Sequence, residues 1–331
     1  MYINQIFELS MVLDNEKFYK ILDKVICREV DLEETNDGYV DDSLESKGII
    51  VKFRNSQYKK KVTLVINSGL FMDNSKQKKE KFILKLDKHI GEYFRYKYQL
   101  NDFDISKVIL TVDINIGNRE DVVAYLKVLQ RIGKVKGFSP ALYEGVDEKS
   151  SFCLNGNSNG ISFLIYDLEG AIIDRHKNLD VSRKKLKSII EDSEGVLRAE
   201  VRLTKPQAIR LYIEETEISE QMTGLMKKSE NIFMETFIRV IPFGDYYKKG
   251  KAEEIIRSEA KDIKLRRRML RLLELISEKK SLYLAQKALN CRNIEKVMDG
   301  FAKINVSPIT ISKRQDEKYL KCIYDYLVDE K

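Results

Sequence analysis

The sequence has little of several residue types, and these shortages exclude whole classes of protein. Four prolines and sixteen glycines among 331 residues leave no place for a long proline- or glycine-rich linker. No apolar run approaches the roughly 20 residues that a membrane span needs. The N-terminal segment, with Asn4, Gln5 and Glu8, does not resemble a signal peptide. We therefore expect a soluble, cytoplasmic protein with no membrane partner.

Cysteine and histidine are too sparse for the usual metal motifs. The four cysteines are far apart and form no CxxC pair, which disfavours a zinc ribbon or finger. The two histidines, His89 and His176, form no HxH pair, which excludes the paired-histidine metal site of one large class of DNA-nicking enzymes. The phosphate-binding P-loop, the GxGxxG fingerprint and the GxSxG elbow are also absent, which disfavours nucleotide-driven motors, dinucleotide enzymes and α/β-hydrolases.

Charge is abundant but unevenly distributed. The net charge is +7, from 59 basic and 52 acidic residues. It is −7 over residues 1–50, +9 over 51–100, −2 over 101–240 and +7 over 241–331. A polyanion such as DNA is a plausible partner for the two basic blocks, and a solvated lysine-rich surface is the alternative.

The first half alternates strand and helix patterns. Strands are expected at 2–12, 48–54, 60–71 and 106–117, and helices at 14–30, 76–98 and 119–134. The acidic segment 31–47 has the composition of a loop. The order β-α-β-β-α-β-α predicts an α+β fold with a mostly antiparallel sheet, flanking helices and ferredoxin-like elements.

A second set of strand patterns precedes a helical end. The turn 156–160 (GNSNG) predicts a hairpin, and 196–203 (VLRAEVRL) alternates as a strand. Beyond residue 206 the patterns are almost all helical. We expect an α+β domain over 1–240 and a basic helical domain over 241–331.

Three acidic residues on predicted strands are candidates for a metal site. Asp113 lies mid-strand, Asp167 ends the strand GISFLIYD, and Glu200 lies between Arg198 and Arg202. If these carboxylates meet on one sheet face, their oxygens would bind Mg²⁺ or Mn²⁺, which can polarise a phosphodiester. The alternative for Arg198, Glu200 and Arg202 is a cross-strand salt-bridge ladder on a solvated face, and the alternative for Asp113 is a polar strand residue at the sheet surface.

A tyrosine pair beside lysines is a candidate nucleophile. Tyr246 and Tyr247 precede Lys248 and Lys249, whose charges would favour a phenolate and neutralise phosphate. The alternative is a helix start whose aromatic rings pack on the core.

The segment KLRRRMLR predicts a basic helix that suits contacts with a phosphate backbone. Its cations, together with Lys248 and Lys249, are the expected nucleic-acid-binding residues: Lys264, Arg266, Arg267, Arg268 and Arg271. Residues 281–298 predict two short helices joined near Asn290, which suits a helix-turn-helix or plain packing.

These segments together resemble a known family. The segment GISFLIYD is followed about thirty residues later by GVLRAEVRL. This pair is similar to two sequence blocks of rolling-circle replication initiators, which occur in plasmids, phages and clostridial-type conjugative elements. In that family one strand ends in Tyr-Asp-Lys, and a later strand has the pattern Arg-x-Glu-x-Arg. The strand with Asp113 resembles the acidic strand that precedes them. The resemblance covers roughly 105–257, and it departs from the family at Leu168, where a lysine is usual.

The resemblance implies a metal-dependent, site-specific DNA nickase and strand transferase. Asp113, Asp167 and Glu200 would be the acidic positions, Arg198 and Arg202 the basic ones, and Tyr246 or Tyr247 the nucleophile. Double-stranded origin DNA, the nicked single strand, a host helicase and a second copy of the chain would be the partners. A catalytically inactive DNA-binding protein of the same fold and a partner-binding structural protein are the alternatives.

Overall fold

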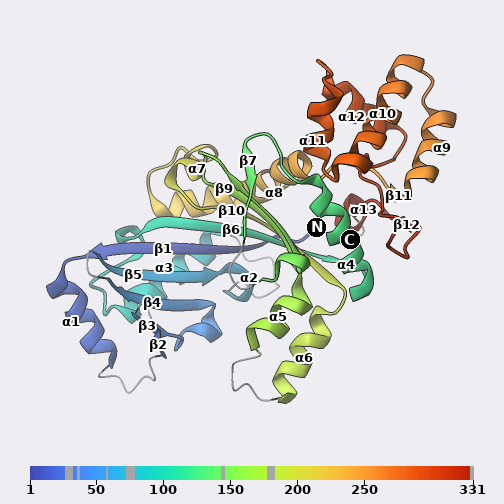
Figure 1. Ribbon diagram of the computed structural model, residues 1–331. Coiled ribbons are helices and arrows are strands. Elements are labelled where there is room, and N and C mark those ends of the chain that lie inside the picture. Colours follow the sequence, from blue (N-terminus) through green and yellow to red (C-terminus); the bar gives the residue numbers. More distant parts are fainter. Residues whose placement is uncertain are drawn as a thin grey trace.

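A single ten-stranded sheet forms the body of the protein in the computed structural model (Figure 1). The structure describes residues 1–26, 33–35, 38–56, 59–71, 79–142, 146–176 and 183–328. The strand order is β2-β3-β4-β5-β1-β6-β10-β9-β8-β7, and every neighbouring pair is antiparallel. The strands are β1 (Asn4–Leu13), β2 (Glu33–Thr35), β3 (Gly38–Asp41), β4 (Ile49–Asn55), β5 (Lys60–Asn67), β6 (Asp104–Asn115), β7 (Phe138–Pro140), β8 (Ser151–Gly156), β9 (Ile161–Asp167) and β10 (Val196–Leu203).

The predicted α+β class and ferredoxin-like elements are confirmed. Along the chain, β1, α1 (Asn15–Ile26), β4, β5, α3 (Lys79–Tyr93) and β6 follow the β-α-β-β-α-β order. In space they adopt the order β6-β1-β5-β4, so the first strand lies between the third and the fourth. The first helix packs Phe18 edge-on against Phe53 of β4, which anchors it to the sheet.

Several elements differ from the sequence-based expectations. The segment 60–71 was expected to be one strand, but β5 ends at Asn67 and a short helix, α2 (Ser68–Phe71), follows. Strand β3 occupies part of the expected loop 31–47, and β7 is an additional edge strand. The GNSNG hairpin is confirmed, since β8 pairs with β9 and Gly160 has a positive φ of 70°. Residues 27–30 of the expected helix 14–30, which include Cys27, and residues 76–78 of the expected helix 76–98 lie outside the described residues.

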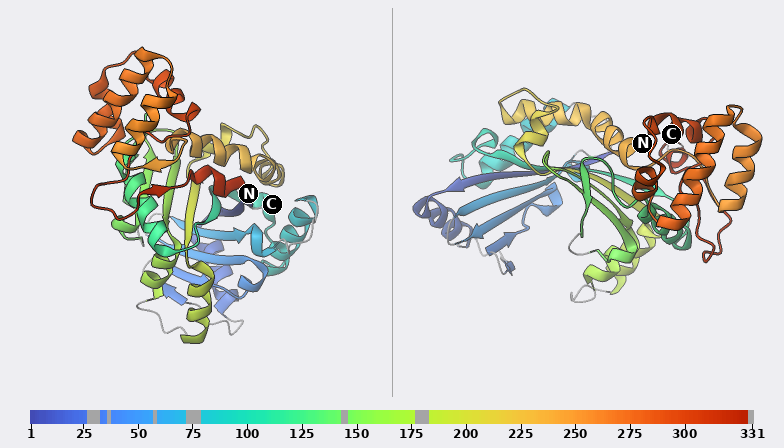
Figure 2. Two further views of the ribbon diagram at one scale, coloured as in Figure 1. Left: turned by 90° about the vertical axis from the view of Figure 1, so that its right-hand side faces the viewer. Right: turned by 45° about the horizontal axis from the view of Figure 1, so that its top comes forward.

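The sheet has one apolar face and one polar face. Alternating side chains such as Phe7, Val112 and Val201 are fully buried on the apolar face, which α1, α3, α4 (Arg119–Leu129) and α8 (Ile218–Val240) cover (Figure 2). The opposite side chains, including Asp113 and Arg198, form what we call the polar face. Because burying apolar surface is the main driving force of folding, helices gather on one side and leave much of the polar face uncovered.

Helices make up most of the chain after β9. They are α5 (Leu168–His176), α6 (Arg183–Ser193), α7 (Pro206–Arg210), α8, α9 (Lys249–Glu259), α10 (Ile263–Lys279), α11 (Leu282–Leu289), α12 (Ile294–Lys303) and α13 (Ile323–Val328). The predicted helical C-terminal part is therefore confirmed. Helix α8 ends next to the predicted domain boundary at 240/241, and buried side chains continue across it in one core. The boundary between two domains stays a prediction. Among the described residues, no helix has the length and apolar character to cross a bilayer.

The chain leaves the body near Ile241 and returns to it near Leu320. A two-stranded ladder pairs β11 (Tyr246–Tyr247) with β12 (Tyr319–Leu320), so the outgoing and returning segments are hydrogen-bonded to each other. The Tyr125 hydroxyl donates to the Lys321 carbonyl at 2.7 Å, and Tyr324 donates to the Ile241 carbonyl. We call residues 248–318, which include α9 to α12, the helical lobe (Figure 1).

Candidate functional site

Asp113 and Arg198 form a cross-strand ion pair on the polar face. They are directly opposite each other on β6 and β10. Arg198 donates through Nε and Nη2 to the two Asp113 carboxylate oxygens, at 2.6 and 2.7 Å. Burial favours the neutral arginine, but the ion pair with Asp113 outweighs it and raises the pKa of Arg198. Arg198 therefore stays charged at any ordinary pH. The side-chain exposures are 48% for Asp113 and 29% for Arg198.

Glu200 is the centre of a buried network on the same face. Its Oε2 accepts from Nε of Arg202 at 2.8 Å, and its Oε1 accepts from the Tyr166 hydroxyl at 2.8 Å. The side chains of Arg202 and Glu200 are only 9% and 8% exposed. Burial, followed by the charge of Glu200, raises the pKa of the Tyr166 phenol, so this hydroxyl remains a proton donor.

Asp167 lies on the opposite face of the sheet. Tyr166 is opposite Arg198, so its chain neighbour Asp167 points to the helix-covered side, opposite Leu197. There the buried Asp167 accepts from Nε of Arg119 at 3.1 Å, and the same guanidinium reaches Glu169 at 3.2 Å. Arg119, at the start of α4, was not expected from the sequence to contact a site residue.

The three acidic residues therefore do not fit one cation. Both oxygens of Asp113 are bound by Arg198, those of Glu200 by Arg202 and Tyr166, and Asp167 is behind the sheet. Within the described part of the chain, no group of three or more His, Cys, Asp or Glu side chains is arranged to hold a metal ion. The expected convergence of Asp113, Asp167 and Glu200 is thus wrong. A cross-strand salt bridge, the alternative reached from the sequence for Arg198, does form, and its partner is Asp113.

Leu168 occupies the position at which a lysine is usual in the resembled family. It is 8% exposed and packs with Leu164, Tyr166 and Ala171 in a small apolar cluster. The position is therefore occupied by a core side chain and not by a cation that could contact phosphate.

Tyr246 is a core residue in this structure. Its side chain is fully buried, and its ring meets Tyr125 edge-on at 5.9 Å between centroids. Burial raises the pKa of the phenol well above its ordinary value. A phenol that is enclosed in the core and held neutral cannot reach a phosphate, so the nucleophile expected at Tyr246 is not available in this conformation.

The substitution Tyr246→Phe is expected to leave the protein as stable as the wild type or up to about 2 kcal/mol more stable, because the buried hydroxyl has no hydrogen-bond partner in the described structure. Urea unfolding followed by circular dichroism measures the difference. Tyr125→Phe is the matched control, because it removes a hydroxyl that donates to Lys321 and should destabilise by about 1 kcal/mol. A loss above 1 kcal/mol for Tyr246→Phe would contradict this account.

Tyr247 is more accessible than Tyr246 and is bound to a carboxylate. Its hydroxyl donates to Asp245 Oδ2 at 3.2 Å, and Tyr319 donates to the same oxygen at 3.2 Å. Burial, and then the charge of Asp245, raises the pKa of the Tyr247 phenol. Lys248 does not approach the phenol as expected, since its ammonium binds the backbone carbonyls of Ser312, at 2.7 Å, and Gln315.

The predicted DNA-contacting cations divide into engaged and exposed groups. Lys249 pairs with Glu253 at 3.5 Å, Arg271 pairs with Glu274 at 2.8 Å, and Arg266 donates to the carbonyls of Arg257 and Ala260. Lys264, Arg267 and Arg268 are exposed on α10. The predicted helix pair 281–298 is confirmed as α11 and α12, with Asn290 in the left-handed conformation at their junction.

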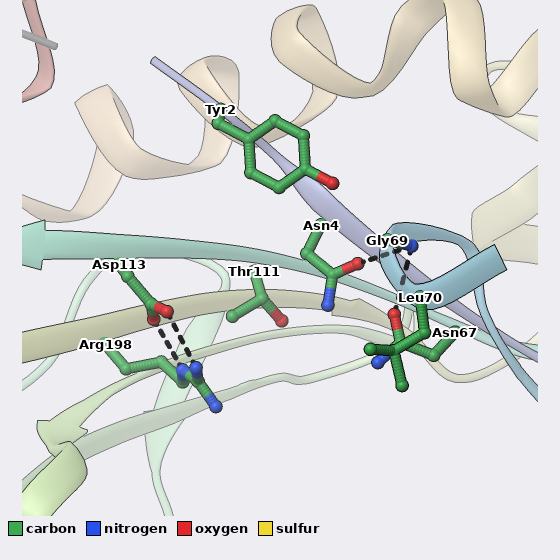
Figure 3. Close-up of a pocket in the computed structure, with 8 residues that line it drawn as sticks. All are labelled: Tyr2, Asn4, Asn67, Gly69, Leu70, Thr111, Asp113 and Arg198. Atoms are coloured by element: carbon green, nitrogen blue, oxygen red, sulfur yellow. Dashed lines mark hydrogen bonds and ion pairs between the residues drawn. The ribbon is translucent and has the colours of Figure 1, made fainter. Parts of the chain in front are cut away.

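A pocket of about 380 Å³ lies beside the Asp113–Arg198 pair (Figure 3). It is bounded by β1, β5, β6, β10 and α2, and its walls are Tyr2, Asn4, Asn67, Gly69, Leu70, Thr111, Asp113 and Arg198. Sequence patterns did not identify this pocket, because it depends on the pairing of β1 with β6 and β5, which are far apart in the chain.

Comparison with known proteins gives little. No family model matches the sequence, and no curated protein matches it. Among solved structures, the chain is similar to the rolling-circle replication initiator protein from Geobacillus stearothermophilus, with 12% identity and a TM-score of 0.29 over 62% of this chain and 76% of that chain. At that TM-score the similarity carries no argument about function.

Proposed function

We propose that this protein binds DNA as a replication initiator or origin-recognition protein of the rolling-circle type. One observation carries the proposal: most of the motif residues that resemble this family come together on three neighbouring strands. Asp113 on β6, Tyr166 on β9 and the Arg198–Glu200–Arg202 series on β10 form one connected polar patch, whereas Asp167 faces the other side of the sheet. That residues from segments separated in sequence lie in one patch supports a common role for them.

Two surfaces suit the binding of DNA. The polar face also carries Lys52, Arg54, Lys61 and Lys107 on β4, β5 and β6, of which Lys107 is paired with Glu8 of β1 at 3.0 Å. Helix α10 presents several exposed cations in the helical lobe, among them Lys264, Arg267 and Arg268. Surface cations bind the phosphates of DNA and do not select a sequence. Contacts that distinguish one sequence from another would therefore come from the hydrogen-bonding side chains near Arg198.

Binding to the DNA that flanks the gene tests the proposal. Fluorescence anisotropy with a labelled duplex should give an affinity that falls linearly on a plot of log K against log salt concentration. Absence of salt-sensitive binding would contradict the proposal and favour the structural alternative. A random duplex of equal length is the control, and an origin-recognition protein should prefer the flanking sequence over it.

The second candidate function is nicking of DNA through a tyrosine in the presence of Mg²⁺ or Mn²⁺. The observation that favours it is the hydrogen bond from the Tyr247 phenol to the Asp245 carboxylate, since a carboxylate in that position can accept the proton of an attacking hydroxyl. The raised pKa of Tyr247 means that this hydroxyl would need such a base at neutral pH. The geometry favours DNA binding over this chemistry, because neither tyrosine is part of the Asp113–Glu200 patch.

If nicking occurs through Tyr247, the substitution Tyr247→Phe is expected to abolish it while duplex binding stays within about twofold, because only one hydroxyl is removed. The assay uses supercoiled plasmid with the flanking DNA, with and without Mn²⁺, and scores relaxed product with protein on a 5′ end. Tyr319→Phe is the matched control, since it removes the other hydroxyl bound to Asp245. Relaxation by Tyr247→Phe at the wild-type rate would eliminate this nucleophile.

A further inference from the structure

The pocket beside Arg198 has the size and lining of a site for one unpaired nucleobase. Its volume of about 380 Å³ is near the lower end of the range for small-molecule sites in proteins. We propose that this pocket receives one unpaired base of a DNA strand, stacked on Tyr2 with its edge toward Asn4 and Asn67. The inference rests on the proposed function in one respect, because it takes DNA as the partner. It adds that the DNA bound at the polar face is an unpaired strand.

Tyr2 supplies the stacking surface. Its side chain is 60% exposed, which is high for an aromatic ring. Figure 3 shows the ring across the pocket from Thr111, above the side chain of Asn4, rather than packed on the core. An exposed aromatic ring at a polar pocket is the arrangement by which proteins stack the bases of single strands, because every base has a π-face.

Two carboxamides supply hydrogen-bond donors. The backbone N–H of Gly69 donates to Oδ1 of Asn4 and to Oδ1 of Asn67, each at 3.1 Å. This fixes both oxygens, and neither Nδ2 has an acceptor among the described residues; Figure 3 shows Nδ2 of Asn4 directed into the pocket. Ring nitrogens and carbonyl oxygens on the edges of unpaired bases are acceptors that match these donors.

Gly69 allows this arrangement because it has no side chain. A Cβ at this position would be 2.5 Å from Oδ1 of Asn4 and 3.1 Å from the Tyr2 hydroxyl. Any larger residue would therefore push Oδ1 of Asn4 away and press against the Tyr2 hydroxyl.

The pocket is suited to a base rather than to a phosphate. Arg198 is its one cationic wall residue, and Asp113 neutralises it through two hydrogen bonds. The remaining walls are uncharged. Affinity gained here should therefore come from stacking and amide hydrogen bonds, and it should be nearly independent of salt, unlike binding through the cations of α10.

A labelled duplex with and without a short single-stranded overhang tests the inference in the full-length protein. The overhang is expected to tighten binding roughly tenfold, within the range for one stacked base. An overhang of abasic sugar-phosphates keeps the charge but should give no gain, and the gain should be equal at low and high salt. Tyr2→Ala should remove the gain and Tyr2→Phe should keep it, while Tyr96→Ala, which alters another tyrosine that is 65% exposed, is the matched control.

The outcomes separate this inference from the proposed function. Equal gains from normal and abasic overhangs, or an unchanged gain in Tyr2→Ala, would overturn the base pocket while duplex binding still supports a DNA-binding role. If the wild-type protein binds neither the duplex nor the overhang, the proposed function fails and the inference with it. Loss of the gain in Tyr2→Ala alone, with duplex affinity preserved, is the expected result.

Discussion

Replacement of Glu200 by alanine is expected to lower the free energy of unfolding by about 3–5 kcal/mol. Glu200 accepts from Nε and Nη2 of the buried Arg202, and it also accepts from the buried Tyr166 hydroxyl. The variant would take this carboxylate away from both groups, and removing one partner of a buried ion pair is among the largest single-residue penalties in proteins. Urea unfolding in the absence of DNA measures the effect.

Asp113→Ala is the matched control for Glu200→Ala. It also removes a carboxylate that binds an arginine on β10, but Asp113 is 48% exposed, so water can solvate Arg198 after the change. The expected loss is about 1 kcal/mol or less, as for exposed ion pairs. Equal losses for the two variants would mean that burial does not set the cost, and a loss below 1 kcal/mol for Glu200→Ala would contradict the buried network.

Replacement of both Arg267 and Arg268 by alanine is expected to weaken duplex binding about 50-fold at 0.1 M salt. Each phosphate contact contributes close to one unit of slope on the plot of log K against log salt, so two lost contacts should reduce the slope by about 2. If the two proteins bind equally at 1 M salt, this difference in slope gives a roughly 50-fold difference in affinity at 0.1 M salt. Both residues are exposed on α10, and no described carboxylate is paired with either one. Anisotropy titrations at several salt concentrations measure both quantities.

The control for this variant removes the same number of positive charges from a different helix. Lys81 and Lys88 are exposed on α3, on the other side of the molecule from α10 (Figure 1). Their double replacement by alanine should alter the affinity less than about twofold, because charges beyond a Debye length are screened. If both double variants weaken binding equally, overall charge and not α10 is responsible.

The main strands and helices could be predicted because their patterns are local. Strict alternation in residues 196–203 predicted β10, and the same alternation correctly placed Arg198, Glu200 and Arg202 on one side. The strands that were missed are β2, β3, β7, β11 and β12. Each of them has no more than four residues. Such strands form because a neighbouring strand supplies hydrogen-bond partners, and a single segment does not carry that information.

The assembly of the site could not be predicted because it depends on register between distant strands. Alternation fixed Tyr166 and Asp167 on opposite faces of β9, but only the pairing of Tyr166 with Arg198 decides that Tyr166 joins Glu200 while Asp167 faces Arg119. Tyr246 is adjacent to lysines in the sequence, yet its environment is set by Tyr125, more than a hundred residues earlier. Sequence proximity to a cation is therefore a weak guide to the state of a phenol.

The helical lobe is attached to the body at more places than the two points where the chain crosses between them. The pairing of β11 with β12 and the Tyr125–Lys321 hydrogen bond hold these two crossings. In addition, Arg131 donates to the Thr310 carbonyl, and the Gln315 side chain donates to the Ala124 carbonyl at 3.4 Å. A lobe on a single linker could pivot freely, whereas these contacts restrain the lobe relative to the sheet. The exposed cations of α10 are therefore carried at a restrained position relative to the polar face.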